Sequence, residues 1–118
     1  MASDFASLKE KAEQAINSFS KELFDLNQEI WKNPELCYKE KHAHDVLTGY
    51  LEKKGFEVSR KHTLDTAFRA VSGNGNAGLT VGVMCEYDAL PNVGHACGHN
   101  LIAEAGVAAG MGENRSIL

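Results

Sequence analysis

A short polar segment between an apolar run and a helical pattern constrains the fold of this chain most strongly. The segment is Gly94-His95-Ala96-Cys97-Gly98-His99-Asn100. It comes after the run 79–85, which is almost entirely apolar. Side chains two residues apart project to the same side of extended or looped backbone, but diverge by roughly 200° on a helix. The pattern therefore predicts a strand, an irregular loop and then a helix, with the side chains of Cys97 and His99 facing one pocket.

Cys97 and His99 are candidate metal ligands because thiolate and imidazole bind borderline-soft divalent metals. Gly98 between them allows the backbone to approach a ligand closely. Cysteine and histidine also occur together in purely structural turns, and one Cys-x-His spacing is less specific than paired Cys-x-x-Cys motifs. The spacing alone leaves both a metal site and a structural turn open.

Three segments resemble one enzyme family. The run from Cys85 to Ala103, with its Glu-Tyr-Asp-Ala-Leu-Pro and Cys-Gly-His-Asn motifs, resembles the signature of the amidohydrolase branch of the aminoacylase/carboxypeptidase metallopeptidase superfamily. Its variants are similar to the Xaa-Arg (β-alanyl-lysine) dipeptidase group. Residues 31–40, which contain Asn-Pro-Glu-Leu and a trailing glutamate, resemble a second motif, and residues 66–70 resemble the strand before the family's hairpin. The similarity extends from about residue 15 to about residue 110.

The resemblance implies a metal-dependent hydrolase that cleaves the amide bond of a small peptide or N-acyl amino acid. It implies two bridged divalent ions (zinc, manganese or cobalt), with Cys97 shared between them and His99 bound to one. Asp88 and His95 are candidates to orient the ligands, since a carboxylate bonded to a ligating imidazole tunes its basicity. A turn-forming role is the alternative for Asp88. Glu86 stands where more distant relatives have a metal-binding histidine, and that role is not transferred to it.

A two-metal hydrolase needs more groups than these. A catalytic zinc has three protein ligands and a water, and the reaction needs a general base. In the family these come from a Glu-Glu pair and two further histidines, none of which follows His99 here. Residues 111–114 also break the apolar helical pattern. We expect residues 1–110 to be the N-terminal part of the catalytic domain, residues 111–118 to be a divergent tail, and the chain to be truncated and catalytically incomplete.

Composition narrows the functional classes. The chain has 118 residues, a net charge of −4, 43% hydrophobic and 24% charged residues, as expected of a globular domain. Basic residues never cluster beyond adjacent pairs, which argues against nucleic-acid binding. No apolar stretch approaches the roughly 18 residues of a membrane span. Three cysteines at unrelated spacings do not indicate a disulfide framework, and the start lacks a secretory signal, so we expect a cytoplasmic protein.

Hydrophobic periodicity predicts helices in the first half of the chain. Apolar residues recur at three- and four-residue steps over 5–30, which predicts one amphipathic helix ending before Pro34. Heptad spacing over the same residues favours a second interpretation, a helix-mediated interaction module without catalysis. A second helix is predicted over 39–54, with Gly55 in the left-handed conformation at its end.

Three strands and a third helix complete the expected fold. The strands are predicted over 56–61, 67–72 and 79–87, with a hairpin turn at 73–78 between the last two, and the helix begins at Asn100 as N-cap. The run 79–87 is typical of a strand covered on both faces and carries Asp88 to the end where α/β sheets bind ligands.

The expected fold class is α/β. We expect a partial three-layer α/β/α catalytic domain of about three helices and three or more strands, without the remaining sheet and the dimerisation domain that the resemblance implies. Family members are expected to form homodimers. An apolar strand with too few helices to cover it predicts that this chain self-associates.

Overall fold

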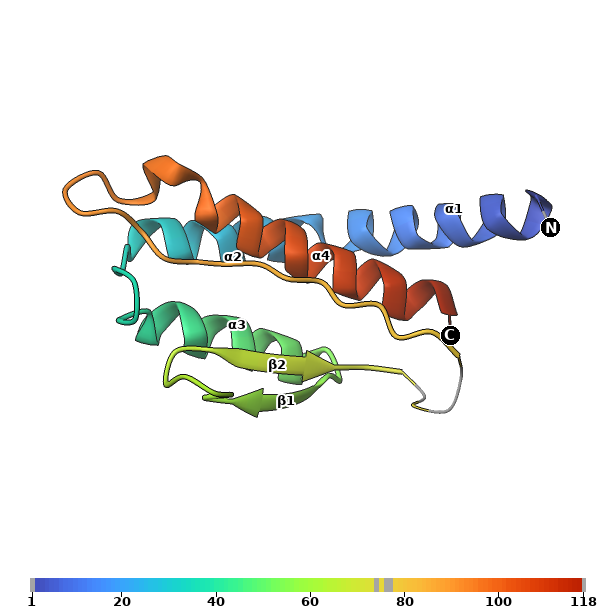
Figure 1. The fold of residues 1–118 in the computed structure, drawn as a ribbon. Coiled ribbons are helices and arrows are strands. Elements are labelled where there is room, and N and C mark those ends of the chain that lie inside the picture. Colours follow the sequence, from blue (N-terminus) through green and yellow to red (C-terminus); the bar gives the residue numbers. More distant parts are fainter. Residues whose placement is uncertain (1, 74, 76–77, 118) are drawn as a thin grey trace.

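Four α-helices and one antiparallel hairpin make up the described residues, 2–73, 75 and 78–117, of a computed structural model (Figure 1). In chain order the elements are α1 (Ala2–Ser18), α2 (Ser20–Lys32), α3 (Lys41–Lys53), β1 (Glu57–Arg60), β2 (Phe68–Val71), the short 3-10 helix η1 (His95–Cys97) and α4 (His99–Ile117). Helix α4 packs along α1 and α2, while α3 packs between α2 and the hairpin. The predicted mixed α/β class is confirmed.

The long helix predicted at the N-terminus is broken at Phe19, so the prediction of one continuous helix is wrong. The Ser18 hydroxyl donates a hydrogen bond to the Ala15 carbonyl at 2.7 Å. In a regular helix that carbonyl would accept from the Phe19 N–H, which here donates to the Ile16 carbonyl at 3.1 Å. A serine that bonds back to the preceding turn bends a helix. The break separates α1 from α2, and both pack along α4.

The hydrophobic core lies where α2, α3 and α4 meet. Its buried members are Leu23, Leu26, Ile30, Ala43, Leu47, Leu51, Ala103, Val107 and Met111. Burying such side chains stabilises the fold by roughly 1.5–3 kcal/mol each. The core therefore holds together the helices that flank the polar loop predicted to carry the site.

Polar side chains link α2 to α4 next to this core. Asn27 is 3% exposed, and its Nδ2 donates to Glu104 Oε2 at 2.6 Å. Asn100 Nδ2 donates to Asn27 Oδ1 at 3.1 Å. The prediction of Asn100 as an N-cap is wrong, since α4 begins one residue earlier and the side chain bonds to α2. The pairing satisfies amides that would be costly to bury alone.

The hairpin joins the first two predicted strands. Val58 lies opposite Ala70, and Arg60 opposite Phe68. The strands predicted at 56–61 and 67–72 are confirmed, but the predicted pairing of the second strand with a third is wrong. The turn proposed at 73–78 falls partly on residues 74, 76 and 77, which lie outside the described residues. The helix predicted over 39–54 is also confirmed, and Gly55 behind it has φ of 89°.

The third predicted strand, residues 79–87, is not a strand, and this corrects the sequence prediction. The segment runs lengthwise beside α4 in Figure 1, and no strand in the described part of the chain pairs with it. Leu79 and Met84 are 98% and 97% exposed, so the segment is not covered on both faces. A strand needs a neighbour for its backbone N–H and C=O groups, and an apolar sequence does not provide one.

The helical pattern does not end where the sequence suggested. Helix α4 continues to Ile117, and Met111 within it is only 3% exposed. The expectation that residues 111–114 interrupt the helix is therefore wrong, whereas the division into a domain and a tail stays a prediction. Among the described residues, no helix has the length and apolar character needed to cross a membrane.

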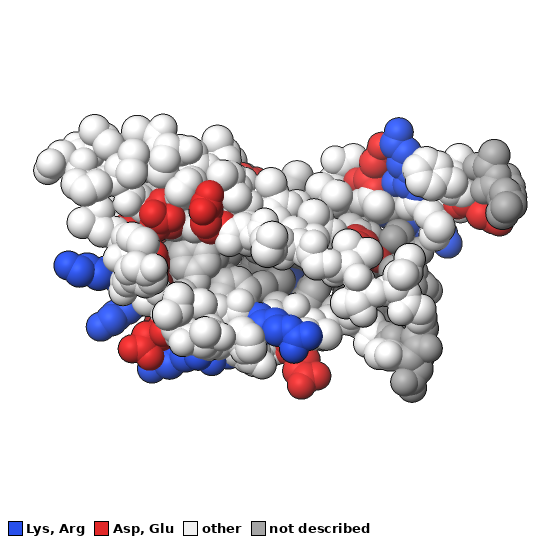
Figure 2. All heavy atoms as spheres, in the orientation of Figure 1, with Lys and Arg blue, Asp and Glu red and all other residues white. Residues whose placement is uncertain are grey.

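Charged side chains of both signs are interspersed on the face shown in Figure 2. Several bases are paired with acids of neighbouring elements. Lys54 Nζ lies 2.6 Å from Glu22 Oε2, and Arg60 Nη2 lies 2.9 Å from Glu52 Oε2. Such exposed pairs contribute little to stability, typically below about 1 kcal/mol each.

Gly106 tests the packing of residues 79–87 on α4. A methyl group there would lie 2.7 Å from Cys85 Sγ, whereas one at Gly110 would meet nothing within 4 Å. We expect Gly106→Ala to lower the free energy of unfolding by about 1–3 kcal/mol. Gly110→Ala, the matched control, should raise it by up to about 1 kcal/mol. Urea unfolding measures both, and equal effects at the two positions would contradict this packing.

Candidate metal-binding site

Backbone contacts bring the Asn-Pro-Glu-Leu motif beside the segment that ends in Asp88. Leu36 pairs with Ala89 in an isolated parallel bridge, and the Ala89 N–H donates to the Glu35 carbonyl at 2.7 Å. The Leu90 N–H donates to the Gly94 carbonyl at 2.9 Å and closes a turn. These bonds return the chain toward the start of α4, so the two motifs recognised in the sequence meet in space.

Left-handed backbone conformations make this return possible. Asn92, Gly94 and Gly98 have φ of 66°, 58° and 79°. Glycine adopts such angles without steric cost, and asparagine tolerates them better than most residues. Gly98 lies directly before α4, so the left-handed turn places the His99 imidazole at the first position of that helix.

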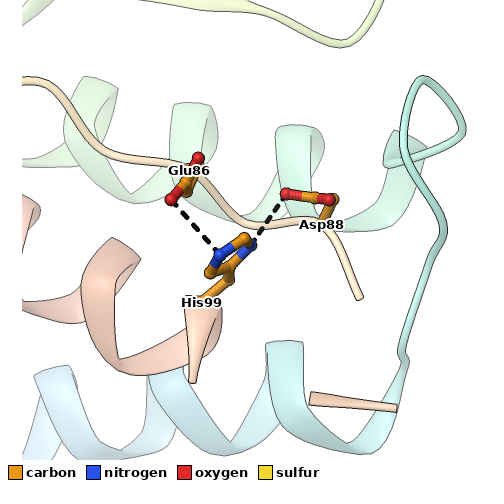
Figure 3. Close-up of side chains that lie close together, drawn as sticks. All are labelled: Glu86, Asp88 and His99. Atoms are coloured by element: carbon orange, nitrogen blue, oxygen red, sulfur yellow. Dashed lines mark hydrogen bonds and ion pairs between the residues drawn. The ribbon is translucent and has the colours of Figure 1, made fainter. Parts of the chain in front are cut away.

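Two carboxylates flank the His99 imidazole (Figure 3). Its Nδ1 lies 2.8 Å from Asp88 Oδ1, and its Nε2 lies 3.2 Å from Glu86 Oε1. One potential ligand atom from each residue falls within 4.8 Å of the others. Carboxylate oxygens and imidazole nitrogens are common ligands of divalent cations. The three residues therefore fit the divalent metal that the sequence resemblance implies.

Cys97 contacts the backbone of the same aspartate. It is half-buried in η1, and its Sγ donates to the Asp88 backbone carbonyl at 3.6 Å. Cys97 and His99 thus both converge on Asp88, one at the backbone and one at the carboxylate. The thiol does not belong to the group formed by Glu86, Asp88 and His99. The roles of Cys97 and His99 as metal ligands, and of Asp88 as their orienting carboxylate, stay predictions.

His95 is the first residue of η1 and does not belong to the cluster of Glu86, Asp88 and His99. It is 8% exposed, and neither of its ring nitrogens has a hydrogen-bond partner among the described residues. Burial lowers the pKa of His95 below its usual range, and the neighbouring His99 lowers this pKa further. A neutral imidazole is the form that such an apolar setting favours. The orienting role predicted for His95 is not tested by these contacts.

Sequence reasoning left out Glu86. The signal that could have identified it is its spacing from Asp88, because residues two apart on extended backbone face the same side. The same spacing argument selected Cys97 and His99. Glu86 is also exposed, with 61% of its side chain accessible, and exposed glutamates are common without a binding role.

Negative charge gathers around Asp88. Glu40 is 7% exposed, and one carboxylate oxygen accepts from the Tyr38 N–H at 2.9 Å while the other has no partner among the described residues. Partial loss of water contact raises the pKa of the Cys37 thiol, which belongs to an exposed residue, and the charges of Asp88 and Glu40 raise this pKa further. Asp88 and Glu40 therefore both act as negative charges on the same thiol.

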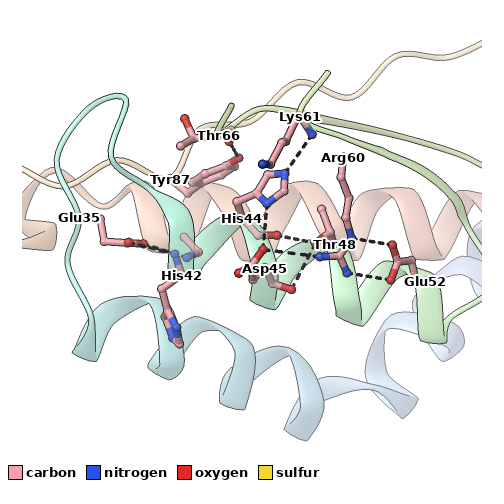
Figure 4. Close-up of polar contacts among 11 residues, drawn as sticks. Glu35, His42, His44, Asp45, Thr48, Glu52, Arg60, Lys61, Thr66 and Tyr87 are labelled. Atoms are coloured by element: carbon pink, nitrogen blue, oxygen red, sulfur yellow. Dashed lines mark hydrogen bonds and ion pairs between the residues drawn. The ribbon is translucent and has the colours of Figure 1, made fainter. Parts of the chain in front are cut away.

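Polar contacts connect α3, the loop before it and the hairpin, and Tyr87 takes part in them (Figure 4). Glu35 accepts from the His42 N–H and the Ala43 N–H, both at 2.9 Å, and so satisfies free donors in the first turn of α3. The Tyr87 hydroxyl donates to the Thr66 carbonyl. Burial raises the pKa of Tyr87 above its usual range, so the hydroxyl keeps its proton. Tyr87 therefore ties the segment before Asp88 to the hairpin turn, while Glu35 links the residue after Asp88 to α3.

Comparison with known proteins agrees with the motifs. No protein-family model matches the chain. The chain is 43% identical over 122 residues to the Xaa-Arg dipeptidase of Homo sapiens, covering 93% of this chain and 28% of that protein. It is 44% identical to the Xaa-Arg dipeptidase of Mus musculus, covering 94% and 28%. It is 30% identical to a subunit of p-aminobenzoyl-glutamate hydrolase from Escherichia coli (strain K12), covering 84% and 24%.

These relatives are peptidase-type hydrolases. The mixed α/β fold and the cluster of two carboxylates and one imidazole at the start of α4 are compatible with that class. The chain is similar to the Xaa-Arg dipeptidases along most of its length, and the resemblance found in its motifs is confirmed. It spans 28% of the length of the first two relatives.

Glu35 offers a test of how the site is supported. We expect Glu35→Ala to lower the free energy of unfolding by about 1–2 kcal/mol, because two N–H groups at the start of α3 lose their acceptor. Glu35→Gln keeps one acceptor oxygen and should lose less. Chemical denaturation followed by circular dichroism measures both variants. A loss as large for Glu35→Gln as for Glu35→Ala would contradict the capping role.

Proposed function

We propose that this chain is part of a divalent-metal-dependent hydrolase that cleaves the amide bond of dipeptides or N-acyl amino acids. The observation that carries the proposal is the His99 imidazole, held by the Asp88 carboxylate at the start of α4, with the Cys97 thiol bonded to the backbone carbonyl of the same aspartate. The names of the relatives support a peptide substrate, and the grouping of Glu86, Asp88 and His99 supports a bound cation.

The residues of the chain have separate tasks in this proposal. His99 and Cys97 bind the metal, while Asp88 accepts from the His99 Nδ1–H and leaves Nε2 to bind a cation. A cation held by these residues would supply Lewis-acid chemistry to the carbonyl of the scissile amide. Burial lowers the pKa of His95 and so disfavours a positive charge on this residue beside the cation.

We also propose that the 118-residue chain alone is catalytically incomplete. A two-metal centre needs more ligands than Cys97, His99 and one or two carboxylates, and it needs a general base. The sequence resemblance assigns those groups to a Glu-Glu pair and two histidines after His99, and none of these lies among the 118 residues. We therefore expect cation binding without turnover.

Metal titration tests the proposed function. Wild-type chain should bind Zn²⁺ or Mn²⁺ in isothermal titration calorimetry, and His99→Ala should weaken binding at least about tenfold, the range seen on loss of metal-site partners. His62→Ala is the matched control, because His62 is exposed and outside the cluster. EDTA should remove the bound metal.

Activity measurements complete this test. Incubation with β-alanyl-lysine or Xaa-Arg dipeptides and Zn²⁺, Mn²⁺ or Co²⁺ should give no hydrolysis by the chain alone. Hydrolysis would contradict the proposal that the chain is catalytically incomplete. Failure of the wild type to bind any of these ions would contradict the proposed function and would favour the alternative of a helix-mediated interaction module.

A further inference from the structure

We propose that Glu86 is a ligand of the cation held at His99, with Asp88 positioning the imidazole from the opposite side. The inference rests on the proposed function and deepens it, because it adds an oxygen donor that the sequence motifs did not assign. It is carried by the arrangement of three side chains in Figure 3, which come from the segment before the loop and from the start of α4.

The two edges of the His99 ring define the geometry. Nδ1 lies 2.8 Å from Asp88 Oδ1, and Nε2 lies 3.2 Å from Glu86 Oε1. A neutral imidazole carries one N–H and one lone pair. When Nδ1–H donates to Asp88, the lone pair of Nε2 faces a carboxylate oxygen, and this contact is repulsive unless a positive charge lies between them. A proton can occupy that position, and a divalent cation can replace it with both atoms as ligands.

Other contacts decide which carboxylate positions the ring and which binds the cation. Asp88 is tied down, because its backbone carbonyl accepts from Cys97 Sγ and the next residue, Ala89, donates to Glu35. Glu86 has no other hydrogen bond or ion pair among the described residues than its contact with His99. The side chain of Asp88 is 26% exposed and that of Glu86 is 61% exposed. Glu86 is therefore the carboxylate that is free to rotate onto an entering ion.

The donor set predicts which ions bind. Imidazole nitrogen and carboxylate oxygen accept Zn²⁺ and also harder ions such as Mn²⁺, whereas a thiolate favours Zn²⁺. Glu86 would add a hard oxygen donor to the softer sulfur and nitrogen donors of Cys97 and His99. We therefore expect Glu86→Gln to weaken binding of Mn²⁺ as well as binding of Zn²⁺.

Calorimetric titration of the whole chain tests this inference. We expect Glu86→Gln, which keeps the size of the side chain and removes its charge, to weaken Mn²⁺ and Zn²⁺ binding at least about tenfold. The matched control is Glu57→Gln, an exposed glutamate of β1 outside the cluster, which should bind like the wild type. Thermal unfolding of metal-free Glu86→Gln should match that of the wild type, since the side chain is largely exposed.

Cobalt substitution supplies a readout of the ligands themselves. The visible absorption bands of Co²⁺ depend on the number and type of its ligands, so they should change in Glu86→Gln and stay unchanged in Glu57→Gln. Thiolate-to-cobalt absorption in the near ultraviolet reports Cys97 independently.

The outcomes separate this inference from the proposed function. Wild-type affinity in Glu86→Gln, together with weak binding in His99→Ala, would overturn the role of Glu86 and leave the proposed function standing. No cation binding by the wild type would overturn both.

Discussion

Glu35 makes the connection on which the arrangement of the site depends. Its carbonyl accepts from the Ala89 N–H, and its carboxylate accepts from two N–H groups at the start of α3. One residue therefore joins the loop after α2, the first turn of α3 and the segment that carries Asp88. This connection adds to the bond from Cys97 Sγ to the Asp88 carbonyl and to the turn closed by the Leu90 N–H. The Asn-Pro-Glu-Leu motif thus positions the site and takes no part in the cluster itself.

Polar pairs buried between helices fix the other half of the site. Asn27 of α2 bonds to both Asn100 and Glu104 of α4, within the first two turns of the helix that His99 begins. Because unpaired buried amides are costly, this network selects one register of α4 against α2. The register determines where the first residue of α4 lies. The position of the His99 imidazole is therefore set from two sides, by the α2–α4 network and by its bond to Asp88.

Much of the fold and part of the site could be predicted from local patterns. Helix α3 and the strands of the hairpin follow from periodicity and glycine placement. The predicted non-helical Cys-Gly-His loop is wrong except at Gly98, because Cys97 ends η1 and His99 begins α4. The convergence of His99 and Asp88 followed from the family resemblance. Glu86 was passed over because its approach to His99 depends on a turn of several residues between them. The prediction of one continuous N-terminal helix was wrong because the Ser18 hydroxyl bonds to the Ala15 carbonyl, which a regular helix would use for a backbone N–H.

The sequence by itself determined the types of local structure and the chemical character of the loop, because φ preferences and side-chain periodicity act over a few residues. Only the tertiary structure decided that residues 79–87 remain unpaired, that Asn100 bonds to α2, and that two carboxylates flank one imidazole. The physical reason is that strand pairing and clustering depend on groups far apart along the chain. A short sequence window contains only one partner of each such contact.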